Sequence, residues 1–353
     1  MTDLLAATAA LVDIPSLSHD EGAMADLVES QLRACAWLSV ERIEHNVVAR
    51  TTLGREQRLV LAGHLDTVPP NGNEVGRIEG DTLWGIGASD MKSGLAVMLD
   101  LATTTPDPSI DLTWCFYAAE EVGRADSGLL VLWEQRPDLL AGDAAVLGEP
   151  TGAVVEAGCQ GTMRVRVDLV GVRAHTARPF TGRNAIHRLA PLLDAVAGWE
   201  GRTALLDGCA YAEQLQAVSV SGGVAANVVP DLASVVLNFR FAPDRTGAEA
   251  EAFVRHLVAP FVEEASGDRV EVLDSADGAP PSLGHPLLGA LVEISGAAPV
   301  AKVGWTDVAS FWEHGVPAAN FGPGDPLLAH HPDERVTRAQ LEATRATLAR
   351  LIA

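Results

Sequence analysis

The sequence predicts an α/β protein with a smaller α+β domain inserted into it. Three observations indicate this class. Short apolar strands alternate with helices over the first ~160 residues, strictly alternating strands follow from about residue 163, and apolar helices return after the segment Asp277–Pro281. A chain of 353 residues is long enough for about two domains.

The first part of the chain alternates between the two kinds of element. Its hydrophobic patterns predict helices over 3–13, 21–36, 93–103 and 127–135, and strands over 58–62, 112–117 and 144–147. Because these strands are apolar without interruption, we expect a sheet that is covered by helices on both faces.

The middle part has a different pattern. Arg164–Val170 alternates apolar and polar residues, which is typical of a strand with one exposed face. Further patterns predict a helix over 184–199, strands over 215–220 and 234–241, a helix over 249–264 and a strand over 269–273. This β-α-β-β-α-β order is that of a ferredoxin-like unit. We therefore expect an outer domain over 1–162 and 277–353 and an inserted domain over 163–276.

The charge balance excludes several classes of partner. The chain has 47 acidic and 25 basic residues and a net charge of −22, whereas nucleic acids and anionic membranes require a basic face. No apolar run approaches the ~18–20 residues of a membrane span. The first residues contain no early Lys or Arg, unlike a secretory signal, so we expect a cytoplasmic protein. Four widely spaced cysteines are expected to be reduced, packed thiols.

Acidic residues and histidines follow the predicted strands. They are His64 with Asp66, then Asp90, the pair Glu120-Glu121, Glu149 and His330. Taken singly, each has an ordinary structural interpretation, such as a helix N-cap for Asp90. Ligands of open α/β folds bind beyond the carboxyl ends of the strands, so the groups support one another as one site. The glycines around Asp90 do not match a dinucleotide-binding fingerprint.

Nine stretches carry a family resemblance. They are AGHLDTVP (62–69), GIGASDMKSG (85–94), FYAAEE (116–121), LGEPTGAVVEAGCQGT (147–162), GVRAH (171–175), GGVAANVVPD (222–231), NFRFAPDR (238–245), GWTDV (304–308) and NFGPGDPLLAHHPDE (320–334). With these motifs the chain resembles the dizinc aminoacylase and carboxypeptidase G-type family. Within it, the chain is most similar to actinobacterial enzymes that hydrolyse N-succinyl-LL-2,6-diaminopimelate. The resemblance extends from the first helix to the last.

The resemblance implies a zinc-peptidase-like catalytic domain with a mixed central sheet, and an inserted ferredoxin-like domain for dimerisation that also serves as a lid. It implies two Zn²⁺ ions per subunit, for which Co²⁺ can substitute. One zinc ion would be held by His64, Asp90 and Glu149, and the other by Asp90, Glu121 and His330, with His331 as the alternative to His330. Asp66 would orient His64, Glu120 would be the general acid and base, and the peptide bond after Asp90 is expected to be cis.

The resemblance also implies a homodimer and a set of substrate contacts. His175 would reach the active site of the partner subunit and stabilise the oxyanion there. Asn227 would reach the same site. The expected substrate contacts are Arg178, Asn227, Arg240, Thr306 and Gly324. One departure is Ser310, which stands where the desuccinylase pattern has an arginine. The alternatives are another N-acyl amino-acid hydrolase, such as an acetylornithine deacetylase, and an inactive binding or scaffold relative.

Overall fold

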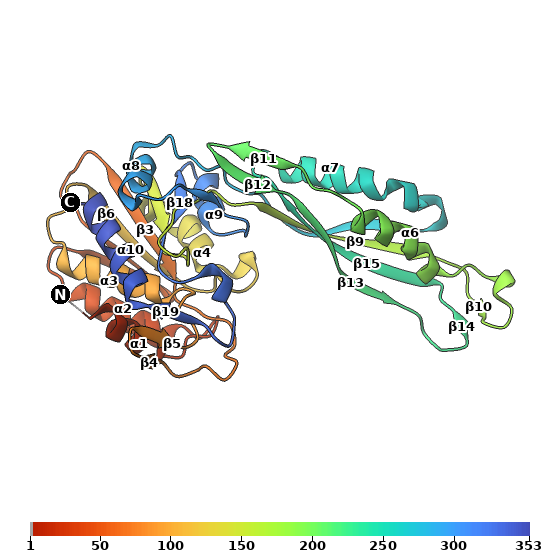
Figure 1. Ribbon diagram of the computed structural model, residues 1–353, viewed down its shortest axis with the longest axis horizontal. Helices are drawn as coiled ribbons and strands as arrows, with labels where there is room; N and C mark the ends of the chain where they lie inside the picture. The colour runs from red at the N-terminus through yellow and green to blue at the C-terminus, as the bar shows by residue number, and fades with distance from the viewer. Residues whose placement is uncertain (1–2) are drawn as a thin grey trace. The chain divides into compact units, whose positions relative to one another are not determined.

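The computed structural model describes residues 3–353. The chain divides into two compact units, each of which has its own sheet and core (Figure 1). The first unit contains residues up to 158 together with 281–300 and 306–353, and the second contains 159–280 and 301–305. The second unit is thus inserted into the sequence of the first.

An eight-stranded sheet forms the centre of the first unit. Its strands lie in the order β1 (Ser39–Ile43), β2 (Asn46–Arg50), β6 (Asp111–Tyr117), β3 (Arg58–His64), β7 (Ala144–Leu147), β18 (Ala318–Asn320), β8 (Glu156–Ala157) and β17 (Val300–Ala301). The four strands from β6 to β18 are parallel, whereas β1, β2 and β8 pair with their neighbours in antiparallel fashion. The sheet is therefore mixed, as predicted.

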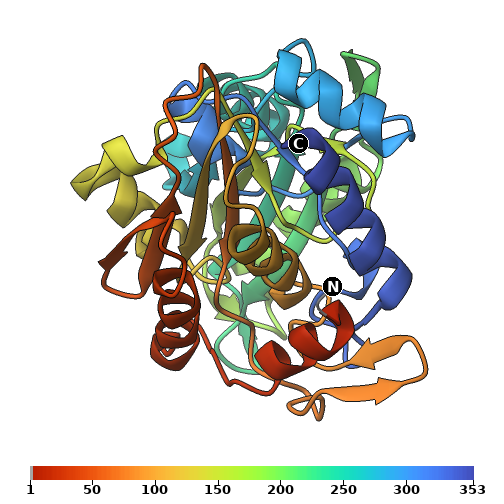
Figure 2. The same ribbon diagram turned by 90° about the vertical axis from the view of Figure 1, so that its left-hand side faces the viewer.

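Helices cover both faces of this sheet. One face packs against α1 (Leu4–Val12), α2 (Gly22–Arg33), α3 (Lys92–Thr104), α8 (Pro286–Ser295) and α10 (Arg338–Leu351), several of which Figure 2 shows. The other face contacts α4 (Gly128–Gln135), α5 (Pro137–Leu140) and α9 (Val308–Glu313). Because side chains alternate along a strand, Leu112, Trp114 and Phe116 of β6 belong to the first of these cores, and Cys115 faces the second.

Two short antiparallel strands and β19 form a small separate sheet in the first unit. Its order is β19 (Arg335–Thr337), β5 (Thr82–Trp84) and β4 (Arg77–Glu79). Strand β19 begins shortly after His330, with residues 331–334 between them, so this sheet holds the chain on one side of the histidine.

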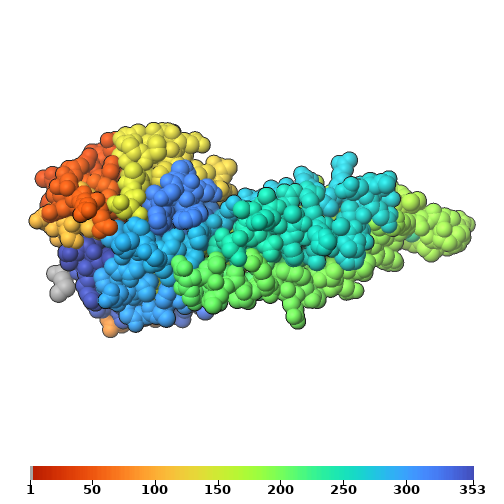
Figure 3. Space-filling model, turned by 90° about the horizontal axis from the view of Figure 1, so that it is seen from above, coloured from red at the N-terminus to blue at the C-terminus, as the bar shows by residue number. Residues whose placement is uncertain are grey.

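The second unit has a four-stranded antiparallel sheet. The strands lie in the order β13 (Gln214–Gly222), β15 (Leu232–Phe241), β9 (Gly161–Val170) and β16 (Arg269–Ala276). Helices α6 (Ala185–Ala197) and α7 (Gly247–Val258) pack on one face, where Val165, Val167 and Leu237 are buried. Figure 3 shows this unit from the side that α7 covers (teal). On the opposite face, Arg166 forms an ion pair with Glu271.

Two pairs of short strands complete the second unit. They are β10 (Ala174–His175) with β14 (Val228–Val229), and β11 (Thr203–Leu206) with β12 (Cys209–Ala212). The hairpins β1–β2 and β11–β12 have no counterpart among the predicted elements.

The predicted helix over 249–264 is too long. Helix α7 ends at Val258 and is followed by a short 3₁₀ turn over Ala259–Phe261. The cause is Pro260, which has no N–H to donate and whose ring clashes with the carbonyl four residues earlier. Similarly, α2 ends at Arg33 rather than at residue 36.

Two further sequence predictions are tested by the structure. Cys35, Cys115, Cys159 and Cys209 are all buried, and none of them forms a disulfide within residues 3–353, which confirms the prediction of reduced, packed thiols. Within residues 3–353, none of the helices combines the length and the apolar character needed to cross a membrane.

Candidate metal centre

The carboxyl ends of three neighbouring parallel strands bring His64, Glu120, Glu121 and Glu149 together, whereas Asp90 lies just before α3 and His330 lies in the loop before β19. His64 is the last residue of β3, the segment Ala118–Glu121 follows β6, and Glu149 follows β7. Strand β3 lies between β6 and β7, so the residues beyond all three strands share one edge of the sheet.

Asp90 lies between two histidines. Its Oδ1 is 3.2 Å from His64 Nε2, and its Oδ2 is 3.6 Å from His330 Nε2. His330 Nε2 also lies 2.9 Å from Glu121 Oε1. Ligand atoms of His64, Asp90 and Glu121 all lie within 4.8 Å of one another, which is a spacing that can hold a metal ion. Each carboxylate oxygen of Asp90 thus faces a different imidazole.

This three-residue group takes members from both ligand sets that the sequence suggested. His64 was assigned to one zinc ion and Glu121 to the other, with Asp90 shared between them, and the structure places all three together. Glu149 is buried and lies close enough to His64 to favour its positive charge. The neighbouring His331 points elsewhere, since its Nδ1 accepts a hydrogen bond from Asp333 N at 3.1 Å.

The acidic surroundings favour protonated histidines when no cation is bound. Burial lowers the pKa of His64, but hydrogen bonds to Asp66 and Asp90 outweigh this effect and raise the pKa well above its usual range. Hydrogen bonds to Asp90 and Glu121 raise the pKa of His330 to about 10. A metal ion requires neutral imidazoles, so it would replace these protons as the partner of the carboxylates.

Glu120 is in a different environment from Glu121. Burial raises the pKa of Glu120 well above its usual range, and the nearby charges of Glu149 and Asp307 add to the effect. The carboxyl group of Glu120 does not belong to the three-residue group. A carboxyl group with a raised pKa at such a site is suited to accept a proton and return it.

Asp66 connects three parts of the site. Its Oδ1 lies 3.5 Å from His64 Nδ1, which also lies 3.1 Å from the backbone oxygen of Asp66. Its two carboxylate oxygens accept hydrogen bonds from Glu120 N and Glu121 N, both at 3.0 Å, and Oδ2 accepts a third from Ser18 Oγ at 2.7 Å. Although burial alone raises the pKa of Asp66, these contacts lower it to about 2.

Glu334 holds the backbone at Asp90, a role that the sequence analysis missed. Its buried Oε1 accepts hydrogen bonds from Ser89 N at 2.8 Å and Asp90 N at 2.9 Å, and burial raises its pKa to about 7. The only signal in the sequence was its position four residues after His330. The peptide bond between Asp90 and Met91 is cis, which confirms the expectation.

Two predicted substrate contacts lie in the first unit. Gly324 has φ +84°, and a Cβ atom there would lie 2.6 Å from Ser89 Oγ, so only glycine fits. Thr306 is buried, and its hydroxyl donates a hydrogen bond to Asn320 Oδ1 at 3.2 Å. Ser310 is also buried, and its Oγ donates to Asp307 Oδ1 at 2.6 Å.

The other predicted residues lie in the second unit. His175 is exposed on β10, and its Nδ1 accepts a hydrogen bond from Ala177 N at 3.0 Å. Asn227 is exposed just before β14, and its backbone oxygen accepts from Thr176 N at 3.1 Å. Arg178 is exposed and Arg240 is half-buried, and neither guanidinium forms an ion pair with a carboxylate of residues 3–353.

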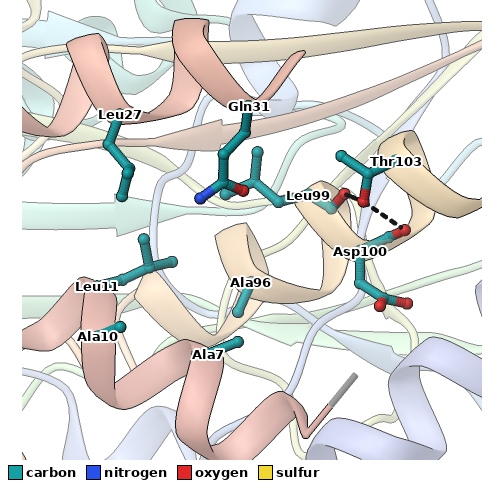
Figure 4. Close-up of a pocket in the computed structure, with 9 residues that line it drawn as sticks. All are labelled: Ala7, Ala10, Leu11, Leu27, Gln31, Ala96, Leu99, Asp100 and Thr103. Atoms are coloured by element: carbon teal, nitrogen blue, oxygen red, sulfur yellow. Dashed lines mark hydrogen bonds between the residues drawn. The ribbon is translucent and has the colours of Figure 1, made fainter. Parts of the chain in front are cut away.

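A groove on the first unit lies apart from this chemistry. It has a volume of about 200 Å³ and lies between α1, α2 and α3, where mostly apolar residues such as Leu11, Leu27 and Leu99 line it (Figure 4). None of the predicted site residues contributes to its lining.

The model of Peptidase family M20/M25/M40 matches residues 60–353, which include both units apart from the N-terminal segment. The chain belongs to this family. It is 49% identical to a Mycobacterium tuberculosis protein that is provisionally named succinyl-diaminopimelate desuccinylase DapE, over 99% of this chain and 98% of the relative. It is 44% identical to the succinyl-diaminopimelate desuccinylase of Corynebacterium glutamicum, over 98% and 95% of the two chains.

A solved structure supports the fold. The crystal structure of a tripeptidase from Staphylococcus aureus matches with a TM-score of 0.81 at 20% identity, over 99% of this chain and 96% of the other. Family membership and the full-length relatives make this M20 protein a metal-dependent hydrolase of amide bonds. The group at Asp90 can hold the metal.

Proposed function

We propose that this M20 protein hydrolyses N-succinyl-LL-2,6-diaminopimelate to succinate and LL-2,6-diaminopimelate, in the synthesis of lysine and peptidoglycan precursors. The observation that carries the proposal is 44% identity with the C. glutamicum desuccinylase over nearly the whole of both chains. The chain also keeps an acid or a histidine at every position that the chemistry requires, which argues against an inactive scaffold.

Two zinc ions fit the donor groups of the site. Zinc prefers imidazole nitrogen and carboxylate oxygen, and the Asp90 oxygens face His64 on one side and His330 on the other. We assign His64, Asp90 and Glu149 to one ion, and Asp90, Glu121 and His330 to the second. Asp90 would be shared by the two ions, because its two carboxylate oxygens face different histidines. Co²⁺ is expected to substitute for Zn²⁺, since it accepts the same donors.

Glu120 carries the proton in the proposed reaction. When bound, the metal ions polarise the amide carbonyl and make water easier to deprotonate. Glu120 accepts a proton from the attacking water and delivers it to the nitrogen of the departing amine, while the acyl carbon retains the water oxygen as a carboxylate. Asp66 orients His64 and holds the backbone of Glu120, so that the proton carrier stays in place.

We assign residues 1–162 and 277–353 to the catalytic domain, and 163–276 to a ferredoxin-like domain that acts as a lid and in dimerisation. Strand β13 supports pairing with a second copy. It is an edge strand with its second side unpaired in the described chain, and Val218 and Val220 on it are 58% and 53% exposed. An exposed apolar edge strand is a template for pairing with another chain.

His175 is suited to stabilise the oxyanion from the partner subunit. Its Nδ1 accepts a hydrogen bond from Ala177 N, which leaves the proton of the neutral ring on Nε2 as a donor. A donor aimed at the developing negative charge lowers the barrier of acyl transfer. Asn227, which lies close by across the β10–β14 pair, is proposed to reach the same site.

Arg178 and Arg240 are proposed to bind substrate carboxylates. Neither forms a direct ion pair with a carboxylate of residues 3–353, although Asp274 lies near Arg240, and a guanidinium binds a carboxylate through two parallel hydrogen bonds. Thr306 and Gly324 are proposed to border the substrate from the catalytic domain, where Gly324 allows close approach of the backbone.

Amine release by the zinc-loaded protein tests the proposed substrate. N-succinyl-LL-2,6-diaminopimelate and N-acetylornithine are compared at equal concentration, and we expect a strong preference for the succinyl compound. Preference for the acetyl compound would instead favour an acetylornithine deacetylase. Ser310 then becomes the first residue to examine, since its side chain is buried against Asp307 and offers no positive charge.

A further inference from the structure

Side-chain oxygens accept hydrogen bonds from four successive backbone N–H groups in the segment 118–121, which follows β6 and includes Glu120 and Glu121. The four donors and their acceptors are Ala118 N to Asn46 Oδ1 at 2.9 Å, Ala119 N to Glu21 Oε1 at 3.1 Å, Glu120 N to Asp66 Oδ1 at 3.0 Å, and Glu121 N to Asp66 Oδ2 at 3.0 Å. Asp66 already has a role in the proposed site, but Glu21 and Asn46 do not.

Glu21 is a fully buried carboxyl group, and no Lys, Arg or His of residues 3–353 forms an ion pair with it. It precedes α2 but makes no capping hydrogen bond to that helix. Its Oε1 accepts hydrogen bonds from His19 N at 2.7 Å and from Ala119 N, whereas no hydrogen-bond partner reaches its Oε2 from residues 3–353. A buried acid is costly, so its interaction with the segment 118–121 requires an explanation.

Ala119 is the point at which this segment turns. Its φ is +58°, in the left-handed region that alanine rarely adopts, and the next two residues are Glu120 and Glu121. A rotation of the backbone at Ala119 would move both glutamate side chains. The hydrogen bond to Glu21 acts on the N–H of the turning residue itself.

Asn46 fixes the preceding residue. It is buried at the start of β2, where its Oδ1 accepts from Ala118 N and its Nδ2 donates to Ile43 O at 3.1 Å. Gly128 leaves space for this amide, because a Cβ atom at position 128 would lie 2.0 Å from Asn46 Oδ1. Asn46 therefore anchors the end of β6, and Glu21 sets the direction in which the chain leaves it.

We propose that Glu21 is a positioning residue of the M20 site: through its hydrogen bond to Ala119 N, and with Asn46 as anchor, it sets the orientation of Glu120 and Glu121. The proposal rests on the roles proposed for those two glutamates. Glu21 acts as a hydrogen-bond acceptor here, so its charge is dispensable.

Three variants of Glu21 separate the acceptor from the charge. Glu21→Gln keeps an oxygen at the Oε1 position and places its NH₂ group where Oε2 has no hydrogen bond. Glu21→Met removes the acceptor but has a similar size. Glu21→Asp shortens the side chain by one methylene group and so moves the acceptor away from Ala119 N. We expect Glu21→Gln to retain kcat within about threefold, and Glu21→Met to lower kcat by about 10²-fold with little change in KM, since a displacement of about 1 Å has such an effect.

The matched control is Asp111→Leu. Asp111 is a buried carboxylate at the opposite end of β6, where it accepts hydrogen bonds from Leu53 N and Arg55 N, both at 2.9 Å. We expect this variant to lose stability but to retain kcat. Equal losses of kcat in Glu21→Met and Asp111→Leu would show a merely structural role and overturn the proposal. A Glu21→Gln variant as inactive as Glu21→Met would overturn the acceptor role.

A second measurement is independent of the substrate. The visible absorption of the Co²⁺-loaded protein reports the geometry at Glu121, and we expect it to change in Glu21→Met but not in Glu21→Gln. Failure of the wild-type protein to cleave the succinyl compound would contradict the proposed substrate alone, because the spectra still test Glu21. If Glu21→Met does not fold, Glu21→Asp decides: at least a tenfold lower kcat supports the proposal, and an unchanged kcat overturns it.

Discussion

Glu120 and Glu121 are neighbours in the sequence, but the structure predicts different consequences when each is changed to glutamine. Glu121 Oε1 lies 2.9 Å from His330 Nε2 and belongs to the three-residue metal group, whereas Glu120 does not. Asp66 holds the backbone N–H of both residues at 3.0 Å. Either substitution therefore removes one carboxylate charge and leaves the loop in place.

We expect Glu120→Gln to lower kcat by about 10²–10⁴-fold, which is the contribution of a positioned proton carrier. This corresponds to an increase of about 2.7–5.4 kcal/mol in the activation free energy, at about 1.36 kcal/mol for each factor of ten. Both metal ions should remain bound, because the Glu120 carboxyl group lies outside the metal group. Glu121→Gln should instead weaken metal binding, because a neutral amide replaces an anionic ligand, and its activity should recover as zinc is added.

The assay combines kcat and KM for the succinyl substrate at saturating zinc with the metal content after dialysis. Glu342→Gln, on the exposed face of α10, serves as a control for the loss of one acidic charge. Metal loss in Glu120→Gln together with full metal content in Glu121→Gln would refute the reasoning, since the two glutamates would then have exchanged roles.

Three further predictions concern other residues. His175→Ala should lower kcat by about 10²–10³-fold at unchanged metal content; mixing it with Glu120→Gln subunits should restore part of the activity, and no recovery would place His175 in the site of its own chain. His330→Ala should lose metal in a dialysis measurement, whereas His331→Ala should not, and the reverse result would exchange their roles. Burial alone raises the pKa of Asp268, but Arg188 and two backbone N–H groups lower it below 3.8, so its contribution to stability is present above that pH and is lost as the pH falls below it. Urea denaturation of Asp268→Asn should therefore show a weaker loss of stability in acid than the wild type, and an equal loss would exclude this carboxylate as the cause.

Local patterns were sufficient to predict most elements of the fold. The apolar strands 58–62, 112–117 and 144–147 all appear in the central sheet, because uninterrupted burial leaves a clear signal in the sequence. The pattern failed where periodicity and backbone chemistry disagree. Phe253, Leu257 and Phe261 continue the helical spacing, but Pro260 ends the hydrogen-bonding pattern before the last of them. The hairpin β1–β2 was missed because β1 is only partly buried and has no clear alternation.

The sequence by itself determined which chemical groups are present and that His64, the pair Glu120-Glu121 and Glu149 follow strands, since those features depend on residue type and local order. The same prediction was wrong for Asp90, which precedes α3, and for His330, which follows a 3₁₀ turn. Residue type and spacing alone did not separate adjacent, chemically equivalent residues, and the assignment of Glu121 and His330 to the metal came from the family resemblance. The tertiary structure shows that His330 Nε2 faces Asp90 and that Glu121 joins the metal group, whereas His331 and Glu120 do not. The physical reason is that these choices depend on backbone direction at single turns. Side chains distant in the sequence hold the backbone of the site by hydrogen bonds to its N–H groups, as Glu21 does at Ala119 and Glu334 does at Asp90.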